Sequence, residues 1–169
     1  GTKLLMAGGG RCNITHEGSI KDFLTCYGAN GSKVRTCLYK HSNLDMMQWF
    51  GENGLPVSAE NGRVFPVSRK SQDVLDLLLR LSADNCWEII TDSRVSGISY
   101  VDCEGGYYSV KADSCKYAAR KLVIATGGIT YPNTGSDGSM FAVLESLGIE
   151  IEKPTSVLAP LGLKDYPYA

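Results

Sequence analysis

Four consecutive apolar residues at 122–125, Leu-Val-Ile-Ala, limit the folds open to this sequence. A continuous apolar run, rather than an alternating one, is typical of a parallel β-strand that is covered on both faces. Parallel strands need long crossover connections, which are usually helical. The run is followed by Thr126, Gly127 and Gly128, at the end of the strand where open α/β sheets bind ligands.

The periodicity of apolar residues predicts helices before and after this strand. Residues 20–54 have helical character interrupted by glycines, and the strongest helix there begins at the N-cap Asn43, with Leu44, Met47 and Phe50 on one face. A second helix begins at the cap Ser71, and a third begins near Ser136.

Short segments joined by tight turns predict the remaining strands. Segments 95–101, 107–111 and 116–119 are close enough in sequence to form a three-stranded antiparallel meander. Two more strands are expected at 63–66 and 88–91. The expected fold class is therefore α/β, or mixed α+β, with a mixed sheet.

The composition excludes several classes of protein. Seventeen Lys and Arg balance 18 Asp and Glu, so no overall field attracts nucleic acid or anionic lipid. No apolar run approaches the roughly 20 residues that span a bilayer. Six scattered cysteines without a C-x-x-C pair, and only two histidines, predict neither a disulfide framework nor a metal site.

A glycine-rich loop at residues 8–13 is the first candidate binding site. Its members are Gly8, Gly9, Gly10, Arg11, Cys12 and Asn13. Glycines let a backbone approach a ligand closely, successive N–H groups bind anions, and an arginine adds a planar cation. A tight turn with a solvated arginine explains the loop equally well, since it matches neither G-x-G-x-x-G nor the P-loop.

Two later segments are also candidates. Ala125, Thr126, Gly127 and Gly128 follow the predicted parallel strand and would leave space for a cofactor. Residues 131–138 place small polar groups before a helix N-terminus, although an Asx-type turn and a cap also explain them.

Four segments together resemble one family of flavoproteins. They are residues 4–15, 62–68, 125–128 and 131–138, in that order. The series is similar to the BaiN/YhiN-type flavoproteins, also called the aminoacetone-oxidase family, over essentially the whole chain. The resemblance implies a cytoplasmic protein with a Rossmann-like domain that binds FAD. It also implies hydride transfer through the flavin, with NAD(P)H as partner and a small-molecule substrate.

The resemblance implies roles for particular residues. The loop at 8–13 would lie along the FAD pyrophosphate and flavin, with Arg11 and Asn13 tuning that environment. Val95 would offer its backbone to the adenine, and residues 125–128 would flank the ribose and pyrophosphate. No catalytic side chain is predicted.

Family members open with a strand, G-x-G-x-x-G and an acidic ribose ligand, so the chain is expected to be an internal fragment lacking the first βαβ unit. Residues 1–157 would form part of the FAD-binding domain, with a helical excursion at 20–62 and the meander at 95–120. Residues 158–169 would begin an inserted domain. Alone, the fragment is expected to be inactive, to bind FAD weakly, and to self-associate through exposed apolar surface.

Two other functions stay open. The chain is a non-catalytic binding module if its glycine loops are only turns. Alternatively, it belongs to a flavoprotein that acts on RNA through basic residues between Lys33 and Lys70. Few aromatics accompany those residues, which is more typical of a solvated face than of an RNA track, so nucleic acid is not the expected partner.

Overall fold

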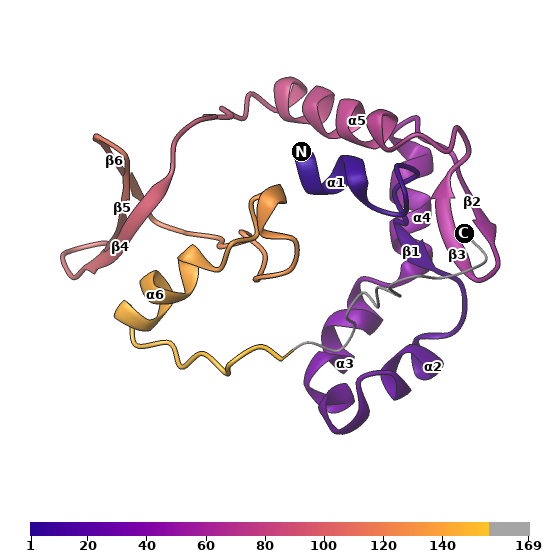
Figure 1. Cartoon of the computed structure of the whole chain (residues 1–169), viewed down its shortest axis with the longest axis horizontal. Helices are drawn as coiled ribbons and strands as arrows, with labels where there is room; N and C mark the ends of the chain where they lie inside the picture. The colour runs from indigo at the N-terminus through magenta and orange to yellow at the C-terminus, as the bar shows by residue number, and fades with distance from the viewer. Residues whose placement is uncertain (156–169) are drawn as a thin grey trace, which may run out of the picture. The chain divides into compact units, whose positions relative to one another are not determined.

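The computed structural model describes residues 1–155 and divides into two compact units, Gly1–Thr91 and Asp92–Ala169 (Figure 1). The α-helices of the first unit are α1 (Thr2–Met6), α2 (Ile20–Thr25), α3 (Gly31–Lys40), α4 (Asn43–Glu52) and α5 (Ser71–Asp84). Its strands are β1 (Thr15–His16), β2 (Val57–Glu60) and β3 (Arg63–Pro66), and a short 3-10 helix, η1, covers Gly28–Asn30. The second unit contains β4 (Val95–Val101), β5 (Tyr107–Ala112), β6 (Cys115–Ala119), η2 (Pro132–Thr134) and α6 (Ser139–Ser146).

A tight hairpin organises the sheet of the first unit. β3 lies between β1 and β2 and pairs antiparallel with both. Glu60 pairs with Arg63, so the turn contains only Asn61 and Gly62, whose φ angles are 51° and 76°. Two positive φ angles match the type I′ turn that an Asn-Gly pair favours.

The core of the first unit forms where helices cover this hairpin. Val64 is fully buried and Phe65 is 2% exposed, although both lie in a strand of four residues. Helix α5 contributes Val74 and Leu77 to a buried cluster. Helix α1 lies against α5 (Figure 1), and the Ser71 hydroxyl fixes the contact by donating to the Leu5 carbonyl at 2.9 Å.

The predicted helices form, but their caps differ from expectation. Ser42, not Asn43, is the N-cap of α4, because Ser42 and Asp45 exchange hydrogen bonds in a capping box. The Asn43 side chain instead donates to the carbonyls of His16 and Gly18 at 2.9 and 3.1 Å, which ties α4 to β1.

Two further details of the predicted helices are wrong. Leu44 is 67% exposed rather than buried, whereas Phe50, from the same predicted face, is buried as expected. Helix α5 starts as predicted, but Lys70 is its N-cap, since the Ser71 side chain is used by α1.

The second unit is built on the predicted meander, which is confirmed. Its strands pair antiparallel in the order β4-β5-β6. Helix α6 packs against β4, and each element supplies a buried apolar residue, Met140 and Ile98 respectively. The mixed α/β class is therefore confirmed.

The strands predicted at 88–91 and 122–125 are wrong. Neither segment pairs with another strand within residues 1–155, and both observed sheets are antiparallel. Val123 is 87% exposed, and Ile89 and Ile90 are about half exposed. A strand needs a hydrogen-bonded neighbour, and apolarity alone does not supply one. The predicted domain limits stay a prediction, and 158–169 lies outside the described residues.

Among the described residues, every helix is too short or too polar to cross a lipid bilayer.

We expect Val64→Ala to lower the free energy of unfolding by about 2–3 kcal/mol, since the substitution leaves a cavity in a fully buried site. Val67→Ala is the matched control, because Val67 lies just beyond the same strand and is 56% exposed. Urea unfolding of both variants measures the difference. Equal losses would contradict the placement of Val64 at the centre of the core.

Candidate functional site

The backbone of the loop at 8–13 is left-handed over most of its length. Gly8, Gly9 and Gly10 have φ angles of 59°, 67° and 83°, and Cys12 has 57°. The Ala7 carbonyl accepts hydrogen bonds from Gly10 N and Cys12 N at 3.2 and 2.9 Å, which closes the loop. The loop is therefore a defined turn directly after α1.

Glycine is needed in this loop for two different reasons. A Cβ at Gly8 would lie 2.8 Å from the backbone nitrogen of Asn13, so the chain itself fills that space. A Cβ at Gly9 would meet nothing within 4 Å. Within residues 1–155 Gly9 also makes no hydrogen bond, which leaves its peptide N–H accessible to an anion.

Cys12 anchors the loop to the protein core. Its side chain is 8% exposed and belongs to the buried cluster that includes Phe50 and Val74. Desolvation by burial raises the pKa of the Cys12 thiol, which keeps it protonated and poorly nucleophilic. Any ligand contact at Cys12 therefore involves its backbone.

Asn13 has a buried acceptor that is not satisfied. Its Nδ2 lies 3.3 Å from Nε2 of His16, but its Oδ1 is buried and has no hydrogen-bond partner within the described residues. Leaving a buried polar atom without a partner costs about 1–3 kcal/mol. A ligand that donates an N–H or O–H group at this point would remove that cost.

The Arg11 side chain reaches from the glycine loop to the β2–β3 hairpin. Its Nε donates to the Gly8 carbonyl at 3.3 Å, and its guanidinium carbon lies 4.7 Å from the centre of the Phe65 ring. One terminal nitrogen is 3.8 Å from a carboxylate oxygen of Glu60. The predicted cation is thus placed over the β2–β3 hairpin.

The second unit contains a pocket of about 260 Å³ at the N-terminal end of α6. Three of the predicted cofactor residues line it, namely Val95, Thr126 and Gly127. Gly135, Asp137 and Gly138, from the candidate segment 131–138, line it as well. Val95 begins β4, so the fold brings together two predicted segments that are about 30 residues apart in sequence. Ala125 and Gly128 do not line this pocket.

An ion pair that the sequence analysis missed forms part of the pocket wall. Arg94 donates to Asp137 Oδ2 at 2.8 Å, while Asp137 Oδ1 accepts from Ser139 N at 3.0 Å. The Arg94 backbone is itself held by two hydrogen bonds with Asp113, each 3.0 Å long. The signal in the sequence was the acidic residue two positions before a helix start.

The charges of this pocket are balanced. Hydrogen bonds from Ser139, and then from Arg94, hold the pKa of Asp137 well below its ordinary value, so the carboxylate stays ionised. Its charge offsets that of Arg94. A neutral, glycine-lined pocket suits a ring and hydroxyl groups better than a phosphate.

The space for a side chain is occupied at Gly127 and open at Gly128. A Cβ at Gly127 would lie 2.6 Å from the Ser136 hydroxyl oxygen, and the residue has a φ of 76°. A Cβ at Gly128 would meet nothing within 4 Å. The predicted cofactor residues thus fall into two groups, with 8–13 in the first unit and Val95 and 125–128 in the second.

Comparison with known proteins adds to this geometry. A family model described as the HI0933-like protein Rossmann domain matches residues 1–157. The chain is 28% identical to a 3-dehydro-bile acid delta(4,6)-reductase from Clostridium scindens over 169 residues, which cover 100% of this chain and 40% of that protein. It is 25% identical to a ribosomal RNA dihydrouridine synthase from Haemophilus influenzae over 168 residues, which cover 98% of this chain and 41% of that protein.

A ribosomal RNA dihydrouridine synthase from Escherichia coli is also 25% identical, over 96% of this chain and 40% of that protein. The chain therefore spans about two fifths of the length of the curated relatives that it matches.

We expect Gly127→Ala to destabilise the second unit by about 1–2 kcal/mol, because it forces an L-residue into left-handed backbone against Ser136. Gly128→Ala is the control and should leave stability nearly unchanged. Thermal unfolding followed by circular dichroism compares the two. A larger loss for Gly128→Ala would show that the turn has a different geometry.

Asp137→Asn is expected to lower stability near neutral pH and to have a smaller effect in acid. The pKa of Asp137 in the folded state lies below its ordinary value of 3.8. The ionised carboxylate therefore stabilises the fold when the pH is above 3.8. This contribution is lost as the pH falls through the depressed folded-state pKa. Urea unfolding of both proteins near pH 7 and at about pH 3 measures the change. A difference that does not vary with pH would contradict this role.

Proposed function

The chain belongs to the HI0933-like family, the BaiN/YhiN flavoproteins that its sequence resembles, and on this basis we propose that it forms a nucleotide-binding part of an FAD-dependent oxidoreductase. The family is a Rossmann-type oxidoreductase family. Dependence on FAD, the substrate and the electron donor are part of the proposal. The cytoplasmic location that the resemblance implies is also part of the proposal.

The observation on which the proposal rests is the unpaired acceptor of Asn13 beside a left-handed glycine loop. Flavin and adenine both carry N–H groups that can donate a hydrogen bond. Asn13 Oδ1 accepts no hydrogen bond within the described residues, so such a donor would satisfy it. Gly9 offers an open backbone N–H to an anionic group in the same loop. A ligand with both a pyrophosphate and a ring N–H, as FAD has, fits this pair of features.

The pocket of the second unit would hold the adenosine part of a nucleotide cofactor. Its balanced charge and glycine lining suit the adenosine, with the Val95 backbone against the adenine and Gly127 near the ribose.

When bound, FAD would supply hydride transfer, with NAD(P)H as the electron donor. The chain would contribute orientation, since Asn13 and the glycine backbone fix the cofactor through directional contacts. The protonated thiol of Cys12 would exclude water from below the loop without reacting. Among the relatives, a delta(4,6)-reductase and two dihydrouridine synthases have names that describe reductions, which supports a reductase acting on a carbon–carbon double bond.

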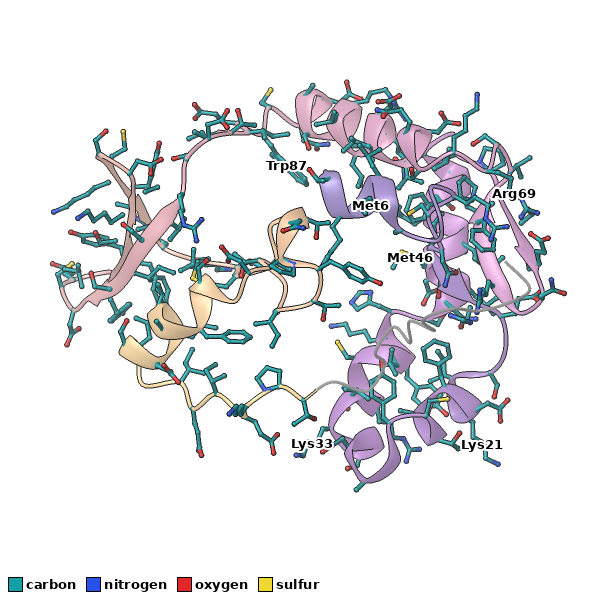
Figure 2. The ribbon with its side chains drawn as sticks, viewed as in Figure 1. Met6, Lys21, Lys33, Met46, Arg69 and Trp87 are labelled. Carbon is teal, nitrogen blue, oxygen red and sulfur yellow. The ribbon has the colours of Figure 1, made fainter. Side chains whose placement is uncertain are left out.

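RNA is a second candidate substrate, because two of the relatives are named for ribosomal RNA. Exposed basic residues lie on α2 and α3, among them Lys21 and Lys33 (Figure 2). Arg35 on α3 is exposed as well. An RNA-binding role predicts affinity that falls steeply with salt concentration. Affinity that is independent of salt would exclude this candidate, and a protein without flavin absorbance would favour a non-catalytic binding module.

We expect Asn13→Ala to weaken FAD binding by about three- to tenfold, since one hydrogen bond to the ligand is lost. Without FAD, the same variant should be as stable as the original chain or more so, because the removed oxygen has no partner. Titration with excess FAD followed by flavin fluorescence measures the affinity, and urea unfolding measures the stability.

Asn30→Ala is the control for both measurements, because Asn30 is exposed at the end of η1. A variant Asn13→Ala that loses stability but keeps its FAD affinity would show that Asn13 is structural. Absence of any FAD binding at high concentration would overturn the proposed function.

A further inference from the structure

The first unit contains a second pocket, which includes Arg11 but neither Gly9 nor Asn13, the two residues assigned above to the flavin cofactor. It measures about 300 Å³ and is lined by Arg11, Glu60, Asn61, Arg63 and Phe65. Four of these residues come from the β2–β3 hairpin, and Arg11 comes from the glycine loop. The volume is at the lower limit of about 300–1,000 Å³ for small-molecule sites, which suits part of a nucleotide.

The Phe65 ring lies against the guanidinium of Arg11, which lines this pocket, and against that of Arg69. Phe65 is 2% exposed, and the guanidinium carbons of Arg11 and Arg69 lie 4.7 and 5.4 Å from its centre. Figure 2 shows Arg69 beside the hairpin. Cation–π contacts of this kind hold a guanidinium in place while its nitrogens remain available for other partners.

The one carboxylate of the pocket is already engaged. Glu60 accepts a hydrogen bond from Arg69. That bond, together with the charge of Arg69 and then that of Arg11, lowers the pKa of Glu60. Arg11 is 3.8 Å from the same oxygen, which is too long for a hydrogen bond.

Arg63 is the cation with no partner. Within residues 1–155 its side chain makes no ion pair or hydrogen bond, although it is exposed at the pocket wall. With Arg69 neutralised by Glu60, the guanidinium groups of Arg11 and Arg63 leave a net charge of +2. Two guanidiniums and the Asn61 amide form a donor set that matches a phosphate dianion.

We propose that this pocket binds the 2′-phosphate of NADPH, and that it makes NADPH rather than NADH the electron donor. The proposal rests on the proposed function, which requires a nicotinamide nucleotide. A phosphate monoester carries close to two negative charges at neutral pH, whereas NADH has no charged group at this position. Arg11, fixed on Phe65, also presents a planar group on which an adenine ring stacks.

The test is calorimetric titration of the chain with three nucleotides. The ligand 2′,5′-ADP contains the phosphate in question, 5′-AMP lacks it, and ADP mimics the pyrophosphate of FAD. We expect 2′,5′-ADP to bind at least about tenfold more tightly than the other two, as charge-assisted hydrogen bonds predict.

Arg63→Gln should weaken the binding of 2′,5′-ADP about tenfold and leave the affinity for 5′-AMP unchanged. Arg35→Gln is the matched control, since Arg35 is an exposed arginine on α3 that lies over Tyr39. Arg69→Gln is a second variant. It frees Glu60 to pair with Arg11 and should therefore also weaken the binding of 2′,5′-ADP.

Several results would overturn the inference. Equal binding of the three nucleotides, or full affinity in Arg63→Gln, would show that the pocket does not recognise this phosphate. Loss of FAD affinity in Arg63→Gln would assign the pocket to the flavin pyrophosphate, and displacement of 2′,5′-ADP by a short RNA would assign it to RNA. A chain that prefers 2′,5′-ADP but never binds FAD would disprove the proposed function and keep the phosphate site.

Discussion

The pairing of β3 with strands on both of its edges is the interaction on which the first unit depends. A strand of four residues can be buried only if its peptide groups are hydrogen-bonded, and β1 and β2 provide those bonds. Val64 and Phe65 can therefore lose contact with water while α5 covers them. The same burial gives Phe65 a fixed position, so a core residue also positions Arg11, which lines a pocket, and Arg69, which pairs with Glu60.

The glycine loop combines a rigid base with an open surface. Cys12 packs into the core, and Gly8 leaves no space for a side chain against the Asn13 backbone. Gly9 faces open space, and Asn13 presents a buried oxygen without a donor. The loop thus packs into the core through Cys12 and keeps an unsatisfied acceptor on Asn13. This combination is typical of a backbone that is shaped in advance for a ligand.

Sequence reasoning succeeded where a local pattern determines structure. Helix 71–84 follows from its apolar periodicity, and the meander follows from its short turns. The hairpin turn at Asn61 and Gly62 and strand β2 before it were both missed, although that dipeptide is a strong hairpin signal. The strand expected at 122–125 failed because apolar residues indicate a need for cover, whereas pairing depends on a partner elsewhere in the chain.

The sequence by itself determined the family, the α/β class and the short motifs, since each depends on residues close together along the chain. Only the tertiary structure decided that Val95 joins Gly127 in one pocket, that Arg11 lies over Phe65, and that Asn13 Oδ1 has no partner among the described residues. These features depend on contacts between segments tens of residues apart, or on the lack of a contact. No local pattern of side chains specifies either one, because the distance between distant segments is set by how the whole core packs.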